Sequence, residues 1–204
     1  MQIWQERSNQ RFNKTINAFA VPGGVVGVHT GLLLNSKTEG QLASVLTHEL
    51  AHLSQHHFAR GVEAAQNANL VSVAGMLAGL VLAATAGGDA ATAAIATTQA
   101  AAIDNQLRYS RAYEREADRL GMKTLHESGY RASEAAGMFR QMQEASRLYG
   151  SGVPEFLRTH PVTKSRIADA ENRSRQLGES GASDTLDFQL MKARTYVLSQ
   201  TDTS

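Results

Sequence analysis

Three residues in one short stretch have the types and the spacing of a zinc site. His48 and His52 stand four positions apart, and Glu49 directly follows the first of them. Residues four apart lie on one face of an α-helix, so both imidazoles can reach one divalent ion while Glu49 points toward a water on that ion. The pattern predicts a zinc hydrolase. The alternative is a helix that carries two surface histidines by chance, in a chain with seven histidines.

The sequence around this motif predicts a buried helix. Apolar residues recur there at helical spacing, at Leu42, Val45, Leu46, Leu50 and Leu53. Residues 36–39 include a serine, a threonine and a glutamate, which are typical of helix starts. A buried helix is rigid enough to keep metal ligands in place.

A second charged segment offers a third ligand, which a catalytic zinc normally needs beside its water. Glu114 and Asp118 are again four residues apart, on a helix predicted over residues 101–126. Glu114 can bind the metal while Asp118 accepts a hydrogen bond from a ligand histidine. Taken alone, the segment is explained better by a solvated charged face, the commoner meaning of such a run.

Taken together, these motifs resemble peptidase family M48, the gluzincin metallopeptidases. Further landmarks support the likeness to a soluble periplasmic branch of that family: residues 17–24, Gly31-Leu32-Leu33, the helix expected over residues 48–57, Arg158-Thr159-His160-Pro161 and Arg166-Ile167. The resemblance implies that His48, His52 and Glu114 bind one zinc ion. It also implies that Glu49 is the general base and that Asp118 supports a ligand histidine from outside.

Length and composition predict one domain over residues 1–204, with 42% hydrophobic residues for a core. The expected elements and the resemblance make its fold α+β and mostly helical. A net charge of +1 gives no electrostatic reason to expect nucleic acid. The absence of cysteine excludes disulfides and thiolate metal sites, leaving histidine and carboxylate ligands. Residues 179–204 are expected to form a C-terminal helix leading toward a repeat domain that this chain lacks.

A short β-hairpin is predicted from residues 18–21 and 25–29, turned at Pro22-Gly23-Gly24. A strand at the edge of a sheet can pair with an extended peptide through its unpaired backbone groups. The candidate substrate-binding residues are Asn17, Ala18, Phe19, Ala20 and Val21. A plain structural hairpin is the other interpretation, and both can hold together.

The segment 70–102 predicts a helical hairpin. Residues 70–86 are an apolar run at the lower length limit of a membrane span, residues 87–89 turn the chain, and residues 90–102 return as an alanine-rich helix. Peripheral contact with a membrane, a flap over the cleft, and packing into the core are all compatible with this composition.

His160 is the remaining histidine with a candidate role. It follows a loop expected over residues 149–159 and precedes Pro161, and a helix is expected over residues 162–177. We expect His160 to be a fourth zinc ligand that latches the site, or else a group that stabilises the oxyanion, for which Arg111 is a second candidate. His56 and His57 are expected to continue the zinc helix and to cap or pack, and His29 and His126 to be ordinary residues.

These features predict a zinc metalloendopeptidase. The resemblance implies a periplasmic location, envelope-protein quality control as the role, and the β-barrel assembly machinery as a partner. Residues 1–13 do not resemble a signal peptide, so an export signal is expected to have been removed. The alternatives are a non-catalytic zinc-containing chaperone or adaptor module and an integral-membrane protease, the latter disfavoured by a single marginal apolar run.

Overall fold

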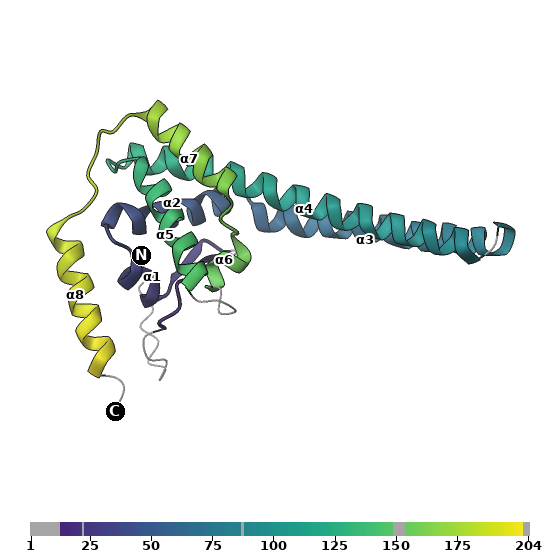
Figure 1. The fold of residues 1–204 in the computed structure, drawn as a ribbon, viewed down its shortest axis with the longest axis horizontal. Helices are drawn as coiled ribbons and strands as arrows, with labels where there is room; N and C mark the ends of the chain where they lie inside the picture. The colour runs from purple at the N-terminus through teal and green to yellow at the C-terminus, as the bar shows by residue number, and fades with distance from the viewer. Residues whose placement is uncertain (1–12, 22, 87, 149–153, 202–204) are drawn as a thin grey trace. The chain divides into compact units, whose positions relative to one another are not determined.

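The computed structural model describes residues 13–21, 23–86, 88–148 and 154–201. Within these residues two strands and eight helices follow one another (Figure 1): β1 (Ala18–Val21), β2 (Val25–Val28), α1 (Thr30–Asn35), α2 (Glu39–Ser54), α3 (His57–Ala86), α4 (Gly88–Glu127), α5 (Ser133–Leu148), α6 (Glu155–Thr159), α7 (Lys164–Leu177) and α8 (Leu186–Thr201). The mostly helical α+β class is therefore confirmed. The sequence also predicts a helix over residues 1–14, of which residues 1–12 lie outside the described residues.

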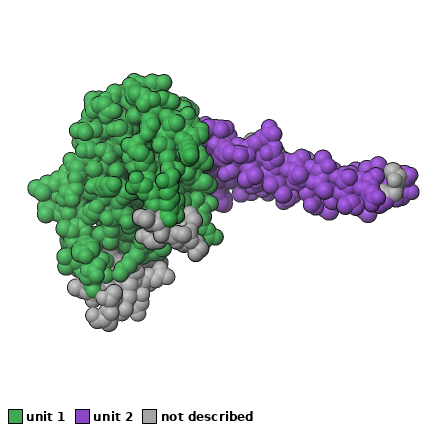
Figure 2. All heavy atoms as spheres, viewed as in Figure 1, with its two compact units in different colours: residues 1–51, 118–204 green, residues 52–117 purple. Residues whose placement is uncertain are grey.

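The chain divides into two compact units, coloured in Figure 2. Unit 1 comprises residues 1–51 and 118–204, and unit 2 comprises residues 52–117. Both α2 and α4 run unbroken through the points of division. The expectation of a single domain over residues 1–204 stays a prediction.

Unit 1 holds the expected β-hairpin. Strands β1 and β2 pair antiparallel, with Ala18 opposite Val28 and Val21 opposite Val25. At the turn, Gly23 and Gly24 have φ values of 102° and 84°, which side chains rarely tolerate. The composition of the turn thus fixed the hairpin locally, as a two-stranded ribbon.

Two apolar clusters form the core of unit 1. One joins β1, α1, α2, α5 and α6 through Ile16, Ala18, Leu32, Val45, Met138, Met142, Phe156 and Leu157. The other joins the end of α4 to α5 and α7 through Met122, Leu125, Ala132, Ala135, Ala136, Phe139 and Ala170. A Cβ atom on Gly121 would lie 3.0 Å from the Cα of His48, so the missing side chain lets α4 approach α2 closely at the motif.

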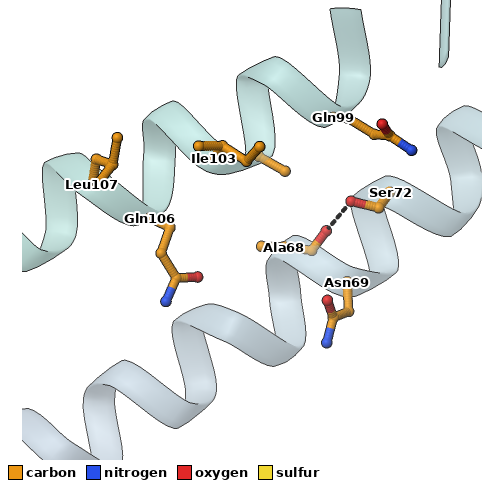
Figure 3. A pocket seen from close by; sticks show the side chains of 8 residues that line it. Ala68, Asn69, Ser72, Gln99, Ile103, Gln106 and Leu107 are labelled. Carbon is orange, nitrogen blue, oxygen red and sulfur yellow. Dashed lines mark hydrogen bonds between the residues drawn. The ribbon is translucent and has the colours of Figure 1, made fainter. Parts of the chain in front are cut away.

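Unit 2 contains α3 and the first part of α4, which contact each other through small residues. A Cβ atom on Gly75 would collide with Thr98, and one on Gly79 would collide with Ile95. Where the contact loosens, a depression of about 410 Å³ opens between the helices (Figure 3), lined by Ala68, Asn69, Ser72, Gln99, Ala102, Ile103, Gln106 and Leu107. None of these side chains titrates, so the depression has no group for acid–base catalysis.

The structure corrects three local expectations. Helix α2 ends at Ser54 and does not continue through His57, because His56 adopts a left-handed conformation with φ of 54° and a new helix begins after it. The loop expected over residues 149–159 includes the short helix α6, which buries Phe156 and Leu157 in the core. Leu50, expected on the buried side of α2, is 48% exposed.

Candidate metal centre

Helix α2 presents His48 and Glu49 from its buried side. Both residues belong to unit 1, and their exposed fractions are 4% and 2%. The last turn of α2 carries His52 one turn further along, as the spacing of four residues requires. A carboxylate as buried as that of Glu49 needs a specific use or partner, because burial penalises its charged form.

His48 is oriented by a carboxylate from α4. Its Nδ1 lies 3.0 Å from Oδ1 of Asp118, and Arg166 donates to both oxygens of that carboxylate over 2.7 and 2.6 Å. Burial raises the pKa of Asp118, but the hydrogen bonds from His48 and Arg166 outweigh it and hold the pKa below its ordinary value. With Nδ1 of His48 engaged in this way, Nε2 is the nitrogen that can face a metal.

His52 meets Glu114 within unit 2. Its Nε2 lies 3.2 Å from Oε1 of Glu114, and its Nδ1 lies 2.9 Å from Nδ1 of His57. Glu114 is buried on α4, one turn before Asp118. Helix α2 thus carries two candidate ligands, and α4 carries one candidate ligand and Asp118, each pair at a spacing of four residues.

His160 ends α6 in unit 1, where its backbone N–H donates to the carbonyl of Phe156 over 2.8 Å. Its Nδ1 lies 3.4 Å from Nε2 of His48, and its Nε2 lies 3.5 Å from Oε1 of Glu49. The Phe156 ring packs beside the imidazole at 4.8 Å between centroids. The His160 ring thus approaches the candidate ligand His48 with one nitrogen and the expected base Glu49 with the other.

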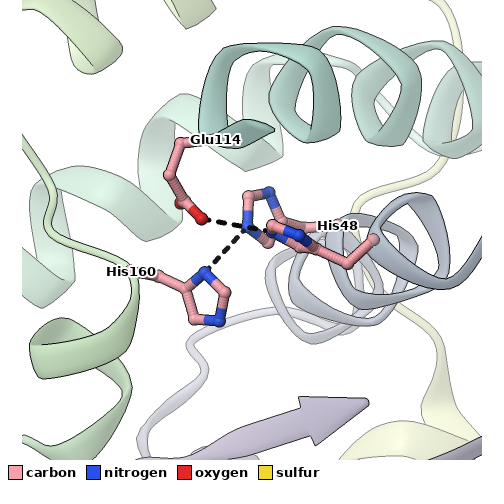
Figure 4. Close-up of side chains that lie close together, drawn as sticks. His48, Glu114 and His160 are labelled. Atoms are coloured by element: carbon pink, nitrogen blue, oxygen red, sulfur yellow. Dashed lines mark hydrogen bonds and ion pairs between the residues drawn. The ribbon is translucent and has the colours of Figure 1, made fainter. Parts of the chain in front are cut away.

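The four side chains offer a donor set that fits zinc. Ligand atoms of His48, His52, Glu114 and His160 all lie within 4.8 Å of one another, and the labelled side chains in Figure 4 converge. Two ligands about 2.0–2.1 Å from a tetrahedral zinc lie about 3.3 Å apart. The His52–Glu114 and His48–His160 separations of 3.2 and 3.4 Å match that edge. Imidazole nitrogen and carboxylate oxygen are also the ligand types zinc accepts when cysteine is absent.

The candidate substrate residues lie in and just before β1. Asn17 and Ala18 are buried, whereas Phe19 and Val21 are exposed. The backbone carbonyl of Asn17 accepts from the amide of His29 over 3.0 Å, which continues the hairpin pairing by one step. Their substrate role stays a prediction.

Arg111, the second oxyanion candidate, is mostly exposed on α4. Its side chain donates to the carbonyl of Leu107 over 3.2 Å and lies 4.0 Å from Asp104. These contacts lie along its own helix, so they give no support to an oxyanion role.

Two neighbours of the candidate ligands, Arg166 and His57, were not predicted as such from the sequence. Arg166 was recognised as a landmark, but its bond to Asp118, 48 residues away, has no local signature. His57 was assigned to capping or packing, yet it contacts both His52 and Glu116. Burial lowers the pKa of His57, against an opposing effect of Glu116, and the hydrogen bond from His57 lowers the pKa of Glu116.

A buried carboxylate beside two candidate zinc ligands on one helix can take a proton from water in hydrolysis, a use that a purely structural site does not have. The arrangement is therefore that of a zinc metallopeptidase. Comparison over the whole chain gives the particular family: the sequence model of peptidase family M48 matches residues 7–174, and the chain belongs to that family. The resemblance expected from the motifs is confirmed.

Several relatives are similar over most of the chain. The beta-barrel assembly-enhancing protease of Escherichia coli K12 is 39% identical over 183 residues, covering 90% of this chain and 37% of the relative. The protein of the same name in Yersinia pestis is 36% identical over 182 residues, covering 89% and 37%. The mitochondrial metalloendopeptidase OMA1 of Bos taurus is 36% identical over 155 residues, covering 72% and 28%. The chain thus spans little more than a third of the assembly-enhancing proteases that it matches.

Proposed function

We propose that this chain is the catalytic domain of a zinc-dependent endopeptidase that cleaves internal peptide bonds of protein substrates. The observation that carries the proposal is the buried carboxylate of Glu49, which follows the ligand His48 within the helical pair. When bound, zinc would supply Lewis-acid polarisation of the attacking water and the scissile carbonyl. Glu49 takes the proton from that water and passes it to the leaving amine, so no covalent intermediate is needed.

The test is Glu49→Gln, which keeps the size of the side chain and removes the proton acceptor. Turnover of a labelled unfolded protein should fall by a factor on the order of 10²–10⁴. Zinc content should remain at about one ion per chain, because the ligands are unchanged. Equal activity in wild type and variant would contradict the assignment of Glu49 as base.

The alternative candidate is a non-catalytic zinc module that acts as a chaperone or adaptor. One observation favours it: if His160 binds the metal with His48, His52 and Glu114, the site has four protein ligands, as structural zinc sites do. The buried Glu49 favours the peptidase. If the wild-type chain acts as a chaperone and does not cleave protein substrates, the alternative is correct.

His160 is proposed to act as a latch that restrains the peptidase. Its Nδ1 lies near Nε2 of His48, and its Nε2 lies near the carboxylate of Glu49. The same side chain can therefore take the place of the attacking water at the metal and also occupy the base that would accept the proton of that water. Release of the latch predicts unchanged or increased proteolysis in His160→Ala. A role in stabilising the oxyanion predicts instead a fall on the order of a hundredfold, which would refute the latch.

Substrate is proposed to bind along β1, from Asn17 to Val21. Among the described residues β1 pairs only with β2, so the backbone groups on its other edge are available to an extended peptide. Such pairing recognises the backbone of the substrate more than its side chains, which suits an enzyme that degrades misfolded proteins of many sequences. Phe19→Ala should raise KM and leave kcat close to wild type if the exposed ring contacts substrate.

The names of the relatives support a role in the bacterial envelope. Two of them are called beta-barrel assembly-enhancing proteases, so misfolded or unassembled outer-membrane proteins are the proposed substrates and the β-barrel assembly machinery the proposed partner. A periplasmic location follows from the same likeness. Copurification of the assembly machinery with a full-length protein that contains this domain tests the partner.

Unit 2 is proposed to contact a membrane surface through the hairpin of residues 70–102. Residues 57–85 form a helix long and apolar enough to cross a bilayer, and Leu70, Leu77, Leu80 and Val81 on it are highly exposed. Between Glu63 and Asp104 the only charged residue is Asp89. Hydroxyl groups in this hairpin donate to carbonyls four residues earlier, so they need no partner outside their own helix: those of Ser72, Thr85, Thr92 and Thr98.

Flotation with vesicles of phosphatidylethanolamine and phosphatidylglycerol tests the membrane contact. Leu80→Ser should reduce the fraction bound, because it places a hydroxyl in the apolar face. Leu190→Ser is the matched control, since Leu190 is a similarly exposed leucine on α8. Absence of wild-type protein from the vesicle fraction would refute the contact.

A further inference from the structure

His57, the first residue of α3, is a buried histidine that the hydrolytic mechanism does not use. Its exposed fraction is 4%. Its Nδ1 lies 2.9 Å from Nδ1 of His52, and its Nε2 lies 3.2 Å from Oε2 of Glu116. Its ring stacks on Tyr113, with 4.5 Å between centroids and 19° between planes. Both nitrogens and one face of this imidazole are therefore engaged within unit 2.

The contacts determine where the protons reside. Nε2 of His52 faces Glu114 at 3.2 Å, so the ligand nitrogen is Nε2 and the proton of a neutral ring must be on Nδ1. Nδ1 of His57 lies 2.9 Å from this nitrogen, so Nδ1 of His57 must carry a lone pair and accept the hydrogen bond. The remaining proton of His57 is then on Nε2, where it is donated to Glu116.

His48, the other candidate ligand on α2, is oriented in a similar way but by a carboxylate that contacts it directly. Asp118 accepts from His48 directly, and Arg166 holds that carboxylate. Behind His52, the carboxylate is that of Glu116, which lies 3.2 Å from Arg60. The imidazole of His57 lies between this carboxylate and His52. Each ligand histidine thus has a carboxylate anchored by an arginine behind it.

We propose that His57 is a positioning residue that fixes the tautomer and ring orientation of His52 and thereby sets the zinc affinity of the site. This inference rests on the zinc centre of the proposed function. Groups that orient ligand histidines in this way typically contribute a factor of about 10–100 in metal affinity. The simpler role for His57 is packing against Tyr113.

Two substitutions separate positioning from packing, because they rank in opposite order under the two roles. His57→Phe keeps a ring to stack on Tyr113 and removes the acceptor for His52. His57→Asn loses the ring and keeps an acceptor near the position of Nδ1. His56→Asn is the matched control: His56 is exposed, and asparagine tolerates its φ of 54°.

Zinc affinity is measured by competition with a chromogenic chelator, and the visible spectrum of the Co²⁺-substituted protein reports ligand geometry. Positioning predicts that His57→Phe binds Zn²⁺ about 10–100-fold more weakly with an altered Co²⁺ spectrum, that His57→Asn recovers part of the loss, and that His56→Asn matches wild type. Wild-type affinity in His57→Phe, or a larger loss in His57→Asn than in His57→Phe, would overturn the proposal.

A second variant keeps the test decisive if His57→Phe does not fold. Glu116→Gln neutralises the carboxylate that orients His57 and leaves the imidazole in place. Positioning predicts weaker Zn²⁺ binding and a changed Co²⁺ spectrum in this variant, whereas packing predicts neither. Failure of the wild-type chain to bind Zn²⁺ would overturn the proposed function as well, and normal wild-type binding with unaffected variants would overturn this inference alone.

Discussion

Replacing Arg166 by methionine should weaken both the fold and the metal site. Arg166 is 6% exposed and makes three short hydrogen bonds: two to the carboxylate of Asp118, over 2.7 and 2.6 Å, and one to the carbonyl of Pro161, over 2.9 Å. Methionine fills a similar volume with a flexible apolar chain. The substitution therefore removes the charge and the donors with little loss of packing.

The expected magnitude follows from the burial of the pair. Without Arg166, the carboxylate of Asp118 is a buried charge that keeps its contact with Nδ1 of His48. Breaking such a pair costs about 3–5 kcal/mol in the free energy of unfolding. For a domain of this size each kcal/mol lowers Tm by about 2–4 °C, so the apo protein should melt on the order of 10 °C lower. Asp118, no longer held by Arg166, should orient His48 less firmly, and zinc binding should weaken about 10–100-fold.

Urea denaturation of the metal-free protein and chelator competition measure the two effects separately. Arg140→Met is the matched control, because Arg140 pairs with Glu171 on the surface, where side chains are 53% and 40% exposed. Such a pair contributes about 0–1 kcal/mol. If Arg166→Met destabilises no more than Arg140→Met and binds zinc as wild type does, the reasoning from the buried pair is refuted.

Two further predictions concern the ligands and pH. Glu114→Gln should weaken zinc binding by more than the factor of about 10–100 expected for an orienting residue, and full zinc content in a Glu114→Gln, His52→Ala double variant would exclude both as ligands. The hydrogen bond from Tyr130 to Glu39, 2.8 Å long, and burial raise the pKa of Tyr130. A raised pKa means that this bond stabilises the fold below the unfolded tyrosine pKa of about 10 and ceases to do so as pH rises through the folded value. Tyr130→Phe should therefore lower the free energy of unfolding by about 1 kcal/mol at pH 7. In urea denaturation at alkaline pH, the variant and the wild type should be equally stable. A difference in stability that does not change with pH would contradict this prediction.

Features that depend on neighbours along the chain could be predicted from the sequence. The spacing of His48 and His52, and that of Glu114 and Asp118, determines which side chains share a helix face, because the helical repeat is fixed by backbone geometry. The hairpin of β1 and β2 follows from its glycine turn for a similar local reason. Helix α6 escaped prediction because five residues are too few to show a period.

Contacts between distant residues were decided only by the tertiary structure. His160 lies 112 residues from His48 along the chain, and Arg166 lies 48 from Asp118, so no periodicity links them. The left-handed His56 likewise ends α2 and starts α3 at His57, which turned a histidine expected on the zinc helix into a partner of His52. The sequence by itself thus predicted the candidate ligands, the candidate base and their helical spacing, since that spacing follows from the repeat of each helix. The hydrogen bonds that orient the ligands, and the histidine that approaches them from α6, depend on how separate elements pack, which only the folded chain specifies.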